Sequence, residues 1–106
     1  MGEPGAEMIA AERRRQVEAE GWTPDHDDEH DACELTLAAV AYAIHAVGEK
    51  NGVCWPEDDQ GAPIGWPWHP SWWKPSGDPI RNLVKAGALI AAEIDRLQRA
   101  GEVRRG

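Results

Sequence analysis

An uncharged stretch decides the fold: Leu35-Thr36-Leu37-Ala38-Ala39-Val40-Ala41-Tyr42-Ala43-Ile44-His45-Ala46-Val47. Its leucines and alanines favour a helix, and a helix that is apolar nearly all round must be covered on more than one side. We therefore expect a helix over residues 31–47 at the centre of the domain. Asp31 and Glu34 have the spacing of a capping box at its start, and Gly48 is expected to end it.

The clearest helix start in the chain lies further on, at Asp78 and Pro79. Asp78 suits the N-cap and Pro79 the first helical position, so we expect a helix over residues 79–100 that stops at Gly101. Apolar residues repeat along one face of it: Ile80, Leu83, Val84, Gly87, Ile90, Ala91, Ile94 and Leu97. We expect this helix and the uncharged helix to form the core pair, with close approach at the small residues of 85–88.

A weaker helix is expected over residues 6–20, after a disordered N-terminus at 1–5. Gly21 is a typical helix stop, and Trp22 after it is predicted to pack back on Val17. Thr23 can cap a further short turn with Pro24 at its first position. We interpret the run of arginines from Arg13 to Arg15 as a solvated face paired with nearby glutamates.

Together these elements predict one all-α domain of three to four helices over residues 6–101, followed by a tail at 102–106. The chain of 106 residues has a net charge of −8, which argues against a protein that binds nucleic-acid backbones. That charge permits a basic protein partner. No signal peptide or membrane span is evident, and two cysteines make no disulfide framework, so we expect a cytoplasmic location.

A long, ordered loop rich in tryptophan and proline is predicted over residues 53–78, between the last two main helices. The stretch from Trp55 to Pro79 contains five of the six tryptophans and six of the eight prolines. Each proline lacks an N–H group and fixes φ, which excludes a regular helix or a central strand. Such an apolar loop must instead be held by its indoles against the helices.

The tryptophans of this loop allow three interpretations. Trp55, Trp66 and Trp68 are expected to serve partly as core residues, since the chain has no phenylalanine. The rings could instead form a pocket that stacks a nucleobase, or an exposed protein interface. For either binding role the expected contact residues are the same: Trp66, Trp68, His69, Trp72, Trp73 and Lys74.

Two further sites can be considered from the acidic residues. His26, Asp28 and His30 lie close enough in sequence to bind a divalent metal, although acidic residues are also expected near a helix start. Carboxylates on the helices suggest, as an alternative function, a metal-dependent all-α nucleotide pyrophosphohydrolase. The Glu-x-x-Glu and Glu-x-x-Asp pairs of such enzymes are missing, and no catalytic residue is predicted.

Three blocks of sequence occur together in this chain, over Glu20–His30, Trp66–Pro75 and Leu83–Ile94. As a set they resemble a widespread family of small accessory proteins encoded by tailed phages and prophages. The resemblance implies a phage accessory protein, and such proteins commonly inhibit host defence systems or host enzymes. We therefore expect a binding protein in the host cytoplasm that counteracts a host system. It would sequester a nucleotide-type signal or bind a host protein through its tryptophan loop. A homodimer through Ala86, Gly87 and Ala88 is an additional possibility.

Overall fold

The computed structural model describes residues 2–29, 33–51 and 56–101 of the chain. These residues form four α-helices, α1 (Gly5–Glu20), α2 (Pro24–Asp28), α3 (Glu34–Asn51) and α4 (Pro79–Ala100), and one 3-10 turn, η1 (Pro70–Trp72). Across the described ranges there is no β-strand, only a single antiparallel bridge between Glu57 and Pro63. The prediction of a small all-α domain is therefore confirmed.

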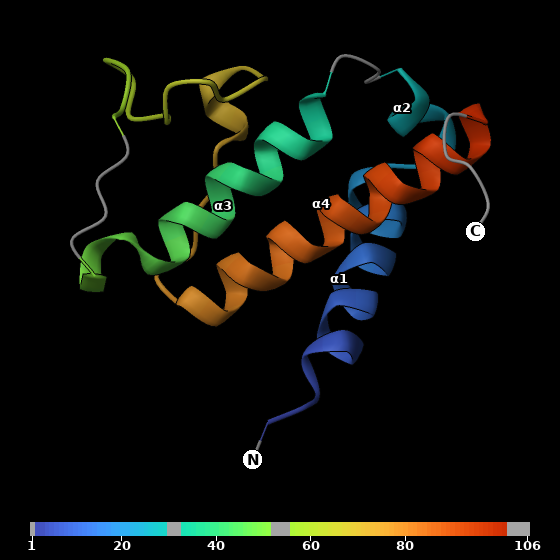
Figure 1. Cartoon of the computed structure of the whole chain (residues 1–106), viewed down its shortest axis with the longest axis horizontal. Coiled ribbons are helices and arrows are strands. Elements are labelled where there is room, and N and C mark those ends of the chain that lie inside the picture. The colour runs from blue at the N-terminus through green and yellow to red at the C-terminus, as the bar shows by residue number, and fades with distance from the viewer. Residues whose placement is uncertain (1, 30–32, 52–55, 102–106) are drawn as a thin grey trace.

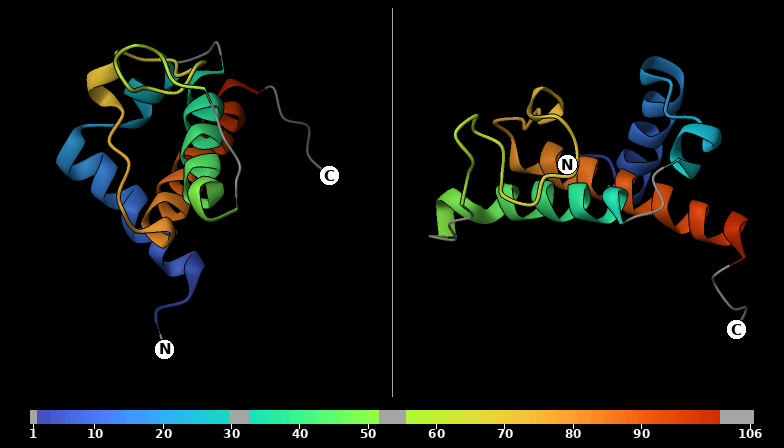
Figure 2. Two further views of the ribbon diagram at one scale, coloured as in Figure 1. Left: turned by 90° about the vertical axis from the view of Figure 1, so that its left-hand side faces the viewer. Right: turned by 90° about the horizontal axis from the view of Figure 1, so that it is seen from above.

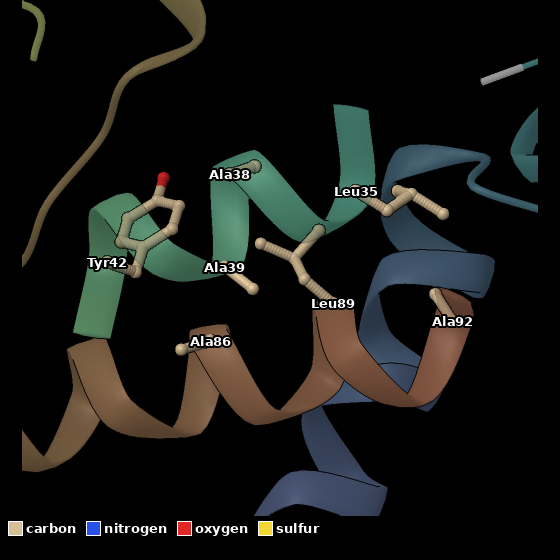
Figure 3. Packing of buried hydrophobic residues seen from close by; sticks show 7 residues of the cluster. All are labelled: Leu35, Ala38, Ala39, Tyr42, Ala86, Leu89 and Ala92. Atoms are coloured by element: carbon tan, nitrogen blue, oxygen red, sulfur yellow. The ribbon is translucent and has the colours of Figure 1, made fainter. Parts of the chain in front are cut away.

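The centre of the fold is the antiparallel pair of α3 and α4, which lie side by side (Figure 1). Small residues from both helices meet there, so the two backbones approach closely. The buried cluster consists of Leu35, Ala38, Ala39 and Tyr42 from α3 with Ala86, Leu89 and Ala92 from α4 (Figure 3). Tryptophans at the edge of this cluster supply the bulk that its alanines lack, since Trp22, Trp66, Trp68 and Trp73 all pack against it.

Local sequence signals set the helix ends. The Asp78 side chain accepts a hydrogen bond from the Ile80 N–H at 2.9 Å, and the Thr23 side chain accepts one from the His26 N–H at 3.4 Å. Gly21 and Gly101 both follow helices with φ of 72°, the left-handed conformation that glycine adopts most easily. The predicted stops and starts at these positions are confirmed.

Helix α3 differs from its prediction at both ends. It begins at Glu34 and continues to Asn51, beyond the expected stop at Gly48, which is buried inside the helix. A helical glycine weakens a helix by about 1 kcal/mol relative to alanine, and this cost does not end α3 at Gly48. The expected cap residue Asp31, like Trp55 in the loop, lies outside the described residues.

The prediction of which face of α4 points toward the core is largely wrong. Of the predicted core residues only Val84 is among the buried residues of α4, which are Asn82, Val84, Ala86, Ala88, Leu89, Ala92 and Arg96. The large residues Ile80, Leu83, Ile90 and Ile94 are about half exposed. Close packing against the alanine-rich α3 favours the face of α4 that carries small residues. The face with the larger isoleucines and leucines is therefore left exposed.

Helix α1 crosses behind α4, and the views in Figure 2 place α1 and the loop on one side of the α3–α4 layer. At the crossing, Gly87 lies against Ile9: an added Cβ would sit 2.5 Å from the Ile9 Cδ1. The dimer surface predicted at Ala86, Gly87 and Ala88 is therefore not free, since both alanines are buried and Ile9 covers Gly87.

The buried residues of α1 are polar. Glu12 accepts hydrogen bonds from Arg15 at 2.8 and 2.9 Å and is also paired with Arg81 of α4, while Gln16 donates to it at 3.4 Å. Paired charges thus hold α1, which is only weakly amphipathic, on α4. No helix within the described ranges is long and apolar enough to cross a bilayer.

Candidate functional site

The tryptophan loop is fastened to the helix pair at three points. The Tyr42 hydroxyl accepts a hydrogen bond from the Lys74 N–H at 3.3 Å, and the Lys85 ammonium donates to the Lys74 carbonyl at 2.7 Å. The buried Asn82 side chain accepts from the Ser76 N–H and donates to the Ser76 carbonyl, both at 2.8 Å. These bonds fix the exit of the loop immediately before α4.

Two tryptophans of the loop pack inward around Tyr42. Trp73 lies 4.8 Å from the Tyr42 ring and edge-on to His45 at 5.5 Å, and Trp66 meets Trp73 at 5.0 Å. The Trp66 Nε1–H donates to the His69 carbonyl at 3.2 Å, which satisfies its polar atom. Trp66 and Trp73 therefore form the support on which the outer part of the loop rests.

The outer part of the loop borders a cavity of about 300 Å³. Five aromatic side chains line it: Trp22, His26, Trp68, His69 and Trp72. Two of them come from the α1–α2 corner and three from the loop, which are far apart in the sequence. A mostly aromatic concavity of this size lies at the lower end of the range for small-molecule sites, about 300–1,000 Å³.

One wall of the cavity is a stack of two rings. The Trp22 indole and the His26 imidazole are parallel within 2°, with centroids 5.8 Å apart, and Trp68 is tilted against Trp22 at 6.0 Å. Gly21 turns the chain so that Trp22 leaves α1 toward the core, and Thr23 starts α2 so that His26 lies one turn later. The stack thus arises because only residues 21–23 separate the end of α1 from the start of α2.

A buried ion pair holds this wall in position. Arg13 donates to the Trp22 carbonyl at 3.3 Å and pairs with Asp27, whose side chain is 0% exposed. Asp27 also lies 3.3 Å from the His26 Nδ1. Arg13 was predicted as part of a solvated face, and the structure shows that it instead joins α1 to the Trp22 carbonyl and to Asp27, the neighbour of His26.

His69 also lines the cavity, and the tautomer of its neutral ring follows from the contact of its Nδ1 atom. Its Nδ1 accepts a hydrogen bond from the Ser71 N–H at 3.1 Å as His69 caps η1. An acceptor Nδ1 places the proton of a neutral imidazole on Nε2. The His69 ring, which lines the aromatic cavity, therefore carries its N–H on Nε2.

A smaller cavity of about 40 Å³ adjoins the first, and Trp22 and Trp72 line both. Three cations and two carboxylates border it: Arg15, Lys74, Lys85, Glu12 and Glu20. The Lys74 ammonium lies 5.3 Å from the Trp72 ring centroid, in a cation–π contact. The Gln16 Oε1 atom, also at this cavity, is buried and has no hydrogen-bond donor among the described residues.

The charges at the smaller cavity are shifted by burial and by each other. Burial alone would raise the pKa of Glu12, but hydrogen bonds from Arg15 and Arg81 outweigh it and hold that pKa below its ordinary value of 4.5. Burial lowers the pKa of Lys85, and the nearby Arg81 adds to this effect. Burial also raises the pKa of Tyr42, which keeps its hydroxyl neutral and able to accept from Lys74.

The predicted contact residues separate into two groups. Trp68, His69 and Trp72 line the aromatic cavity, and Lys74 lies over the Trp72 ring. Trp66 and Trp73 belong to the support around Tyr42. Sequence reasoning missed Trp22 as a lining residue, although the helix stop at Gly21 signalled that this indole turns back into the fold.

The residues considered for metal binding do not gather in the described part of the chain. His26 stacks on Trp22, and Asp28 pairs with Arg99 of α4 at 2.8 Å, while His30 lies outside the described residues. Over residues 2–29, 33–51 and 56–101, no group of three His, Cys, Asp or Glu side chains is placed to hold an ion. The helix carboxylate Glu93 is bonded to Arg96 and Thr36.

Comparison of the chain with protein-family models, with curated proteins and with solved structures gave no match. The function of the site must therefore be inferred from its own geometry.

Proposed function

We propose that this chain is a non-enzymatic binding protein whose aromatic cavity takes one planar heteroaromatic ring, such as the base of a nucleotide-type signal. The supporting observation is the parallel stack of Trp22 and His26 beside a cavity of about 300 Å³ that Trp68 and Trp72 also line. Base stacking on aromatic side chains contributes about 1–3 kcal/mol per base. A flat ring fits between such walls better than a branched aliphatic ligand does.

Polar groups at the cavity favour a base over a plain hydrocarbon ring. The His69 Nε2–H can donate to a ring nitrogen or carbonyl, while the Gln16 Oε1 next door can accept from an amino group. A buried acceptor without a donor is costly, so a ligand or water that supplies one gains free energy. Nucleobases offer both kinds of group on one rigid ring.

Charge limits the number of phosphates that the site will accept. Lys74 and Lys85 border the smaller cavity, but Glu12 and Glu20 lie there too, and the whole chain has a net charge of −8. One phosphate could meet the Lys74 ammonium, whereas a triphosphate would bring more negative charge than the local cations balance. We therefore expect nucleosides and monophosphates to bind more tightly than triphosphates.

The biological role that we propose combines this site with the resemblance to phage accessory proteins. A phage-encoded protein with such a cavity would sequester a nucleotide-type signal of a host defence system. Sequestration requires no chemistry, only a cavity that competes for the signal. The alternative role as a pyrophosphohydrolase is favoured by no contact within the described residues, since Glu12 and Glu93 are engaged by arginines.

Binding of a host protein is the second candidate, supported by one feature of the loop. Trp72 is 50% exposed and Ile64 is 55% exposed, so the loop presents large apolar groups to solvent. Such residues can act as anchors of an interface. In that case a host protein, and not a small ligand, would protect Trp72 from solvent.

Tryptophan fluorescence and the melting temperature test the proposal with a graded set of ligands: free bases, nucleosides, monophosphates, triphosphates and cyclic dinucleotides. We expect quenching and a raised melting temperature with nucleosides or monophosphates, and recovery of the ligand unchanged after incubation with magnesium. Trp72→Ala should abolish both effects, while Ile64→Ala, a control at another exposed loop position, should preserve them. A flat response of the folded protein to every ligand would rule out the proposal.

A further inference from the structure

One face of the α3–α4 layer presents an apolar surface that no described part of the chain covers. On α3 the exposed residues are Leu37, Val40 and Val47, and on α4 they are Ile80, Leu83, Ile90 and Ile94. Their exposed fractions lie between 41% and 57%. These seven residues, which we call the outer stripe, include most of the exposed large aliphatic side chains.

The two halves of the outer stripe lie on the same side of the layer. The Thr36 hydroxyl donates to the Glu93 carboxylate across the two helices at 3.4 Å. Val40 lies one turn after Thr36, and Ile90 lies one turn before Glu93, so both border this seam. Helix α1 and the loop lie on the other side of the layer, as the two views of Figure 2 show.

The apolar residues of the outer stripe are spaced along each helix as in helices that pack against other helices. The exposed positions 37, 40 and 47 on α3, and 80, 83, 90 and 94 on α4, fit an alternation of steps of three and four, in which position 44 is half-buried and position 87 is covered by Ile9. Alternation of this kind places apolar residues at the a and d positions of a heptad, which pack as knobs into holes. A partner surface with the same pattern on two antiparallel helices is therefore the best match.

We propose that the partner is a second copy of this chain, joined through the outer stripe into a four-helix bundle. The exposed part of the stripe amounts to roughly 500–600 Å² of apolar surface, at the upper limit for a typical monomer. A stable interface covers about 800 Å² per partner, about 65% of it apolar in homodimers. The stripe therefore supplies the apolar area that each half of such a dimer requires.

The charges around the stripe also favour self-association. None of the seven residues is charged, and Glu93 at the seam is neutralised by its bonds to Arg96 and Thr36. A membrane surface would require flanking basic residues, whereas this chain has a net charge of −8. A two-fold axis pairs the stripe with itself and closes the assembly. The cavity lies on the loop side, so each copy keeps its site open.

The test is the mass of the purified full-length chain under reducing conditions, by light scattering and sedimentation over a wide concentration range. We expect a mass of twice 11.7 kDa and a melting temperature that rises with protein concentration. Ile90→Glu and, on the other helix, Leu37→Gln should each give a monomer with unchanged helical circular dichroism. Both side chains are about half exposed in the single chain, so their replacement leaves its core intact.

A matched control is Ala10→Glu, which adds a carboxylate to an exposed position of α1 and should leave the dimer unchanged. A wild-type chain that stays monomeric throughout would overturn the proposal. So would a dimer that persists in both stripe variants, or a monomer that instead sediments with lipid vesicles. Because the cavity is on the other side, ligand binding by the monomeric variants separates this result from the proposed function.

Discussion

The Trp22 indole and the His26 imidazole lie parallel within 2°, with their centroids 5.8 Å apart, at the corner between α1 and α2. Neither ring belongs to the tryptophan loop that dominates the sequence. The loop instead contributes Trp68, His69 and Trp72 to the lining of the same cavity. The candidate site is therefore formed jointly by the loop and by a helix corner that lies more than 40 residues earlier in the chain.

The first prediction concerns the ion pair that holds this corner. Arg13→Ala leaves the fully buried Asp27 without its cation and removes the bond to the Trp22 carbonyl. Loss of one partner of a buried pair costs about 3 kcal/mol or more in free energy of unfolding. Chemical denaturation should show that loss, with weaker ligand binding. The adjacent, exposed Arg14→Ala should change neither by more than about 0.5 kcal/mol.

A double-mutant cycle with Asp27→Ala sharpens this test. If the two residues act mainly on each other, the double variant should be more stable than the sum of the single losses predicts. Strictly additive losses would contradict the assignment of Arg13 as the partner of Asp27.

The second prediction concerns the exit of the loop. Asn82→Ala removes both bonds to Ser76 and should lower the free energy of unfolding by about 2 kcal/mol. Asn82→Asp keeps the acceptor for the Ser76 N–H but turns the donor to the Ser76 carbonyl into an acceptor. We expect the aspartate variant to be destabilised as well. In the alanine variant, the Ser76 amide should exchange its hydrogen faster than it does in the wild type. Equal stability of all three chains would show that these bonds do not fasten the loop.

The third prediction is a pH dependence that arises from Glu12. Its pKa is lower in the folded chain than its ordinary value of 4.5, so its contribution to stability is present above that value. The contribution is lost as the pH falls through the lowered pKa. Glu12→Gln should therefore be destabilised by about 1–3 kcal/mol at pH 7 and by clearly less in acid. Denaturation curves at several pH values give the free energy of unfolding of the wild type and of Glu12→Gln. A difference between the two chains that stays constant across pH would contradict the prediction.

The fourth prediction tests the crossing of α1 and α4. Gly87→Ala gains about 1 kcal/mol of helix propensity but places a Cβ 2.5 Å from the Ile9 Cδ1 and 2.8 Å from its Cγ1. Overpacking of this kind costs about 1–3 kcal/mol, so we expect a net loss of stability of about 1 kcal/mol. In an Ile9→Ala background the same substitution should become stabilising. Stabilisation by Gly87→Ala in the wild-type chain would show that α1 does not lie this close.

The helix ends could be predicted from the sequence because their causes are local. Asp78, Thr23 and Gly101 act on backbone groups within a few residues, so short-range chemistry is sufficient. The face of α4 that packs into the core could not be predicted in the same way. Its most apolar side faces outward because an alanine-rich partner selects the small residues of α4, and only the packed pair reveals that choice.

The candidate site could also be predicted only in part, because some of its residues are marked by local composition and others are placed by packing. Composition alone pointed to Trp68, His69 and Trp72, since proline and tryptophan concentrate around them. The separate roles of Trp66 and Trp73 depend on how the rings pack around Tyr42. The contribution of Trp22 depends on the path of the chain after Gly21, which brings that indole to the distant loop.

Binding of a planar heteroaromatic ligand in the aromatic cavity can be followed, one tryptophan at a time, through the indole N–H signals in a nuclear magnetic resonance titration. Adenosine, guanosine and their monophosphates are the probes, added to the folded chain and to Trp72→Ala. We predict saturable shifts of the Trp22, Trp68 and Trp72 signals, smaller shifts at Trp66 and Trp73, and no saturable shifts in the variant. Unchanged signals with every probe, or largest shifts at Trp66 and Trp73, would contradict binding in this cavity.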